Sequence, residues 1–197
     1  MSIVTEALLC SIVAILFHGT GHLVAGILCG TPLTSLRLSA TGLRLQTEAG
    51  MFPSYEAEAL TALGGPVGNL CGNALCILLA RLFDPSPFAA FITEMNATLL
   101  PLSLYLALFN LLPITGFDGG RLVYCILCKR KRHLLVRSPE TTPAQADRVL
   151  TLTSALCLSL LWFCAVYLLL RGRGAVSLYV FCAELFLSLI GNDPGRK

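Results

Sequence analysis

Long apolar stretches, separated by short polar segments, dominate the chain. Each is close to the roughly 20 mainly apolar residues that cross a bilayer as one helix, although the last is short. The pattern therefore predicts an all-α polytopic membrane bundle of about five to six helices. The predicted spans are Ile3–Cys29, Ala57–Phe83, Pro87–Leu112, Val149–Leu170 and Ala175–Ile190.

One segment has a different period. In Ser35–Thr47, leucines alternate with polar residues on both sides of Thr41-Gly42. Alternation of this kind is typical of a half-buried strand, and the central pair suits a turn. We therefore expect a short β-hairpin between the first two spans.

The charge content supports a membrane protein. Only 13% of the residues are charged, about half the share of a typical soluble domain, and the mean hydropathy is +0.77. A net charge of +3 is too small to suggest nucleic acid as a partner. We therefore expect a multi-pass protein whose surroundings are the lipid bilayer.

The basic residues predict the orientation. A run of basic residues from Lys129 to His133 follows an apolar stretch directly, and basic loops stay in the cytoplasm. Counting back across the spans places the hairpin in the cytoplasm and the N-terminus outside. The sequence thus divides into a membrane core at 1–130, a cytoplasmic loop at 131–147 and C-terminal transmembrane helices at 148–197.

The first span carries two histidines, His18 and His22. Residues at i and i+4 lie on one face of a helix, so both rings can reach one metal ion. Polar side chains at membrane depth are costly and usually face the protein interior. The alternative is that each histidine simply hydrogen-bonds a neighbouring helix.

A third metal ligand is expected at Asp118. This acid lies in an apolar region between Pro113 and the pair Gly119-Gly120, which favour irregular backbone. His22 lies about 10 Å and Asp118 about 16 Å from the cytoplasmic ends of their segments, at 1.5 Å per residue. Asp118 alternatively caps the following helix, and both roles are compatible.

Three motifs together resemble the site-2 protease family, the intramembrane zinc metalloproteases that include a bacterial sporulation protease acting on a sigma-factor precursor. The family pattern has H-E-x-x-H on one helix, G-P-x-x-N on the next and N-x-x-P-x-x-x-x-D-G-G on a third. The resemblance covers roughly residues 1–130. The matching residues are His18, His22, Gly65, Pro66, Asn69, Asn110, Pro113, Asp118, Gly119 and Gly120.

The resemblance implies a site and a function. One zinc ion would be held by His18, His22 and Asp118, and substrate would meet Pro66, Asn69 and Asn110. The substrate would be a transmembrane or membrane-associated protein, such as a sigma-factor or anti-sigma-factor precursor. The location would be a bacterial plasma membrane.

One residue departs from the family pattern. The position of the catalytic glutamate, directly after the first histidine, is Gly19. That glutamate moves a proton between the zinc-bound water and the leaving amine, which contributes roughly 10²–10⁴-fold to the rate. Gly19 has no side chain for this task, and it is either a natural or an engineered replacement.

The sequence leaves two main functions open. The first is an intramembrane zinc metalloprotease that is impaired or inactive as written. The second is a non-catalytic pseudoprotease that binds metal and a membrane partner. A metal transporter is disfavoured, because neither further intramembrane acids nor an internal repeat is evident.

Overall fold

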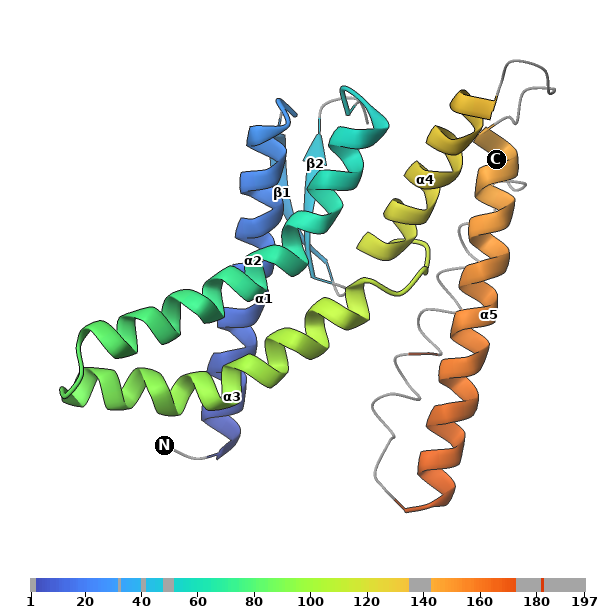
Figure 1. Ribbon diagram of the computed structural model, residues 1–197. Helices are drawn as coiled ribbons and strands as arrows, with labels where there is room; N and C mark the ends of the chain where they lie inside the picture. The colour runs from blue at the N-terminus through green and yellow to red at the C-terminus, as the bar shows by residue number, and fades with distance from the viewer. Residues whose placement is uncertain are drawn as a thin grey trace. The chain divides into compact units, whose positions relative to one another are not determined.

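A computed structural model describes residues 3–31, 33–39, 42–47, 52–134, 143–172 and 182. Within these residues the regular structure is mostly helical, and the predicted helical polytopic fold is confirmed. Helices α1, α2, α3 and α5 are long and apolar enough to cross a membrane. The fifth predicted span, Ala175–Ile190, lies outside the described residues except for Cys182. The helices are α1 (Ile3–Leu28), α2 (Tyr55–Leu82), α3 (Pro87–Asn110), α4 (Asp118–Leu134) and α5 (Pro143–Leu170) (Figure 1).

Two strands lie between α1 and α2, where the alternating leucines occur. β1 (Leu33–Ser39) pairs antiparallel with β2 (Gly42–Thr47), and Leu38 is the register partner of Leu43. The turn residues 40 and 41 lie outside the described residues. Both strands contact α1, the helix that carries the two histidines (Figure 1).

The first three helices form one packed group, in which every pair of helices is in contact. Small side chains fill its centre, including Cys10 and Ala14 of α1 and Cys76 of α2, together with Ile92 and Leu99 of α3. Small residues allow helix backbones to approach closely in a membrane, where there is little hydrophobic driving force between helices. Many other large apolar side chains on these helices are exposed instead.

Serines begin two of these helices. The Ser54 hydroxyl accepts a hydrogen bond from the Ala57 amide at 3.1 Å, and Ser86 does the same for Ala89. These caps satisfy amides that have no partner within the helix. They mark where α2 and α3 begin.

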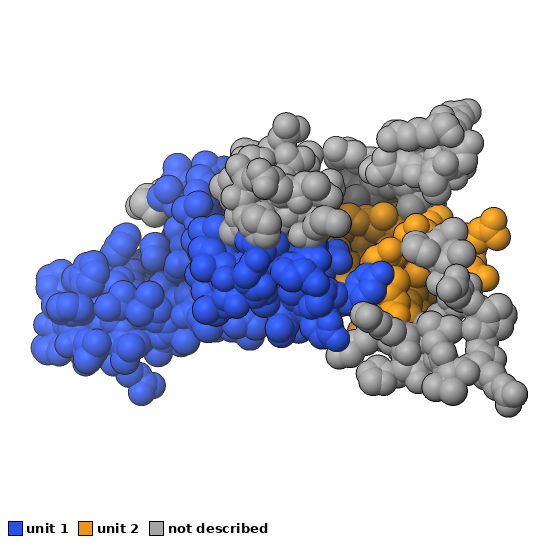
Figure 2. All heavy atoms as spheres, turned by 90° about the horizontal axis from the view of Figure 1, so that it is seen from above, with its two compact units in different colours: residues 1–111 blue, residues 112–197 orange. Residues whose placement is uncertain are grey.

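The chain divides into two compact units, Met1–Leu111 and Leu112–Lys197 (Figure 2). This boundary differs from the predicted division at residue 130 because the helices break just before Pro113. Helix α4 continues to Leu134 and α5 begins at Pro143, so both helices extend into the segment 131–147, whose residues 135–142 lie outside the described residues. Proline is favoured in the first turn of a helix, where its missing N–H has no partner to lose.

Candidate metal centre

His18 and His22 lie one turn apart on α1, and their rings converge. Their Nε2 atoms are 3.1 Å apart, and the ring planes meet at 88°. Both side chains are buried, with 7% and 6% of their surface exposed. Two nitrogens bound to one tetrahedral zinc ion at about 2.05 Å would be about 3.3 Å apart. The pair therefore fits a metal ion with little movement.

The outer nitrogens of both rings are held by α2. His22 Nδ1 donates to the carbonyl oxygen of Thr61 at 2.7 Å. His18 Nδ1 lies 3.3 Å from the amide nitrogen of Asn69. Histidine ligands almost always bind a protein group through the second ring nitrogen, which fixes the ring orientation. The structure thus supplies an outer partner for each histidine and leaves the inner nitrogens facing one another.

Asn69 extends this arrangement to a third helix. Its amide nitrogen also donates to the backbone carbonyl of Ser103 on α3 at 3.3 Å. Asn69 is 1% exposed, and Ser103 is equally buried. The histidine pair is therefore positioned jointly by α1, α2 and α3.

Glycines of α2 make room for the two rings. A Cβ atom built on Gly65 would overlap Nε2 of both His18 and His22. Gly64 and Gly68 of the same helix lie directly against the backbone of Gly21. Only residues without a side chain permit this approach, so the glycines of α2 are part of the site.

Gly19 is buried beside His18 and offers no group for proton transfer. Two acids of the first unit lie elsewhere. Glu6 Oε1 accepts a hydrogen bond from Thr98 at 2.7 Å, three turns before His18, and Glu94 lines a pocket at the α2–α3 connection. Two further acids, Glu56 and Glu58, belong to the first turn of α2.

Asp118 belongs to the second compact unit. It is 7% exposed and forms the first residue of α4. The Phe117 carbonyl accepts the first helical hydrogen bond, from Arg121 at 3.1 Å, so Asp118 lies just inside the helix. A carboxylate there also interacts favourably with the helix dipole.

The loop before Asp118 is tightly built. Gly116 has φ 94°, in the left-handed region that favours glycine, and a Cβ on Gly120 would collide with the carbonyl of Ile114. The amide of Thr115 donates to the hydroxyl of Ser154 on α5 at 2.8 Å. The predicted break between Pro113 and Gly120 is therefore an ordered turn.

The remaining predicted substrate residues differ in their surroundings. Pro66 is buried within α2, next to Gly65. Asn110 is the last residue of α3, and its amide nitrogen donates to Leu106 of its own helix at 2.9 Å. Asn110 is half-buried and shares the first unit with the histidines.

The sequence did not predict three residues that surround the histidine pair. Thr61 and Ser103 accept hydrogen bonds in its network, and Gly65 leaves space for both rings. Thr61 and Ser103 act through backbone carbonyls, which leave no signal in the residue type. The glycine spacing at 64, 68 and 72 was visible, because small residues four apart mark a close helix contact in membranes.

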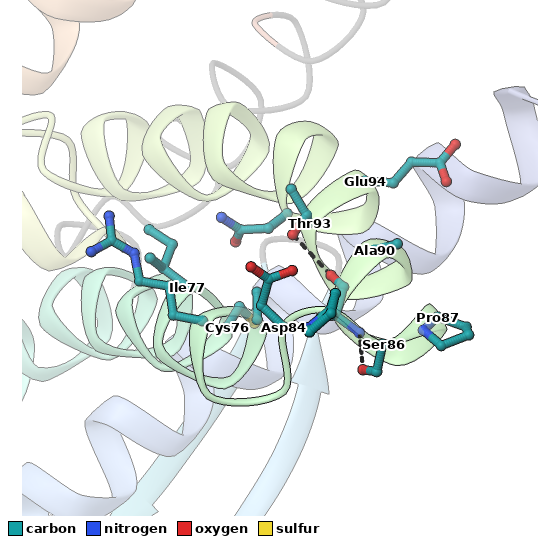
Figure 3. A pocket seen from close by; sticks show the side chains of 13 residues that line it. Cys76, Ile77, Asp84, Ser86, Pro87, Ala90, Thr93 and Glu94 are labelled. Carbon is teal, nitrogen blue, oxygen red and sulfur yellow. Dashed lines mark hydrogen bonds between the residues drawn. The ribbon is translucent and has the colours of Figure 1, made fainter.

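A pocket of about 900 Å³ opens at the other end of α2, where it connects to α3 (Figure 3). Its lining includes Arg81, Asp84, Thr93 and Glu94, and the Glu94 carboxylate points away from Asp84 in Figure 3. Arg81 is sixteen residues beyond Gly65, or about 24 Å along the helix. The pocket is therefore separate from the histidine pair.

A comparison with solved structures supports the helical polytopic fold described above. The four long apolar helices make the chain an integral membrane protein. Its fold is similar to the solved structure of a site-2 protease from Methanocaldococcus jannaschii, with a TM-score of 0.65 and 18% sequence identity. The similarity covers 97% of this chain and 79% of that chain. No protein-family model matches the chain, and no curated protein matches it.

Proposed function

We propose that this protein is an intramembrane zinc metalloprotease of the site-2 type by descent, impaired or inactive as written. The observation that carries this proposal is the buried pair His18 and His22, whose Nε2 atoms converge at a spacing suited to zinc. The shared fold with a site-2 protease supports the same reading.

The proposed ligands of one zinc ion are His18, His22 and Asp118, three buried residues of the types that hold this metal. Bound zinc supplies Lewis-acid polarisation of a carbonyl and activates a water. Asn69 and Thr61 orient the histidines from α2.

The proposed substrate is a transmembrane or membrane-associated protein, cut during regulated intramembrane proteolysis by a glutamate-containing form. Pro66, Asn69 and Asn110 are the proposed contacts with it. A sigma-factor or anti-sigma-factor precursor in a bacterial plasma membrane is the substrate and setting that the motif resemblance suggests.

A second candidate function follows from Gly19. Gly19 is buried next to the proposed metal ligand His18 and has no side chain that could transfer a proton. The alternative is a pseudoprotease that retains the metal and binds a membrane partner without cutting it.

The chain as written and the variant Gly19→Glu separate these functions. We expect both proteins to bind about one zinc ion, measured by metal analysis, and only Gly19→Glu to cleave a transmembrane substrate. The expected gain in rate is on the order of 10²–10⁴-fold, the usual contribution of general acid–base catalysis.

His18→Ala in the Gly19→Glu background is the control, and it should lose both zinc and cleavage. Cleavage by the chain as written would refute the assigned consequence of Gly19. A folded chain that binds no zinc would refute the metal site itself.

A further inference from the structure

The hydrogen bonds around the histidine pair have a fixed direction. A backbone carbonyl can only accept a hydrogen bond, so the contact with Thr61 O requires the hydrogen to be on His22 Nδ1. A neutral imidazole carries one hydrogen, which leaves His22 Nε2 as an acceptor. The 3.1 Å contact between the Nε2 atoms then requires the hydrogen of His18 to be on its Nε2.

The contact between His18 and Asn69 agrees with a hydrogen on His18 Nε2. With its hydrogen on Nε2, His18 accepts at Nδ1, and the group facing it must donate. Asn69 presents its amide nitrogen at 3.3 Å and uses the same nitrogen for the Ser103 carbonyl at 3.3 Å. An amide nitrogen has two hydrogens, one for each contact. If both rings are neutral, the carbonyls of Thr61 and Ser103 thus set the direction of these four contacts.

This arrangement satisfies every ring nitrogen but leaves one atom of Asn69 without a partner. The Asn69 side-chain oxygen is buried and has no hydrogen bond among the described residues. A buried polar atom without a partner costs free energy, and the side-chain oxygens of the neighbouring Ser103 and Asn73 also have no partner among the described residues. The oxygen and nitrogen of an amide exchange places when the group rotates by half a turn.

We propose that Asn69 is a positioning residue that selects between two tautomers of His18. With its amide nitrogen toward His18, Asn69 holds the hydrogen on Nε2, and the two histidines bind each other. With its oxygen toward His18, Asn69 accepts a hydrogen from Nδ1, and His18 Nε2 becomes a lone-pair donor for a metal. This second state rests on the proposed zinc site.

The change conserves charge and protons. His18 loses a proton at Nε2 and gains one at Nδ1, so the imidazole remains neutral. In the second state the Asn69 oxygen gains a hydrogen bond, and the Ser103 carbonyl loses one. Asn69 thereby loses its hydrogen bond to Ser103 of α3 and gains one from His18 of α1.

Nitrogen-15 NMR of histidine tests the first state directly. The chain has three histidines, and His133→Gln leaves only the pair in the spectrum. In chelator-treated full-length protein in nanodiscs, we expect the hydrogen of His18 on Nε2 and that of His22 on Nδ1. Asn69→Asp, whose carboxylate only accepts, should move the His18 hydrogen to Nδ1. A His18 hydrogen on Nδ1 in the unmodified chain would overturn the proposal.

Zinc titration tests the second state. Asn69→Ala should weaken zinc binding about 10–100-fold, the usual effect of losing the outer partner of a metal ligand. Asn69→Asp should bind zinc at least as tightly as the unmodified chain.

Asn73→Ala is the matched control, because Asn73 is 2% exposed on the same helix and donates to the backbone of Asn69 at 2.8 Å. It should change neither tautomer nor affinity. Equal zinc affinity in Asn69→Ala would overturn the role of Asn69. If no variant binds zinc, the proposed function fails, and the tautomers still decide the proposal for Asn69.

Discussion

At the scale of residues, the space around the two histidine rings depends on a glycine of α2. Gly65 lies where any Cβ would overlap both Nε2 atoms, so the rings and α2 share one narrow space. Overpacking of this kind typically costs about 1–3 kcal/mol. Because the same atoms are the proposed zinc donors, overpacking here should also disturb metal binding.

Gly65→Ala should therefore lower both the unfolding temperature and the zinc content, measured by thermal unfolding in detergent and by metal analysis. Gly72→Ala is the comparison, since its Cβ would meet the ring of Phe17 instead of the histidines. We expect Gly72→Ala to be destabilised while it keeps its zinc. Full zinc binding by Gly65→Ala would contradict the observed ring packing.

The residue scale also shows what the sequence can predict. The convergence of His18 and His22 follows from helix geometry alone, because i and i+4 always share a face. Their partners depend on which helix packs against α1 and at what height, which is not local information. Thr61 contributes a carbonyl that every residue possesses, so no residue type marks it.

At the scale of elements, hydropathy located the helices well. Four predicted spans correspond to α1, α2, α3 and α5, with ends within a few residues except for the start of α5. That start differs because polar residues of its first turns do not read as membrane-spanning. The close pairing of α1 and α2 rests on glycines, whose effect on packing hydropathy does not measure.

The contact between α1 and α2 gives a prediction about stability. A Cβ on Gly68 would meet the Phe17 carbonyl and the Gly21 backbone, which cannot move aside as a side chain can. Gly68→Ala should lower the free energy of unfolding by about 1–3 kcal/mol, measured by denaturant titration in micelles. Leu70→Ala, on an outward position of α2 that is 53% exposed, should change it by about 0.5 kcal/mol or less. Equal effects of the two changes would argue against backbone contact as the basis of the pairing.

At the scale of the whole molecule, the proposed ligands come from both compact units. His18 and His22 belong to Met1–Leu111, whereas Asp118 begins α4 in Leu112–Lys197. Local sequence patterns identify each half separately, through helix spacing and through the Pro and Gly residues around Asp118. They do not determine how the halves meet, because that depends on contacts between segments far apart in the chain. A third ligand at Asp118 is thus a proposal about the whole fold.

Replacing the carboxylate tests that proposal. Asp118→Asn keeps the size of the side chain and removes its charge, so a zinc ligand would be lost while the start of α4 is largely preserved. We expect zinc affinity to fall by more than the roughly 10–100-fold that follows loss of an outer partner of a ligand. Asp147→Asn, an exposed acid near the start of α5, should leave the affinity unchanged. If Asp118→Asn binds zinc as tightly as the Asp147→Asn control, the third ligand is another residue.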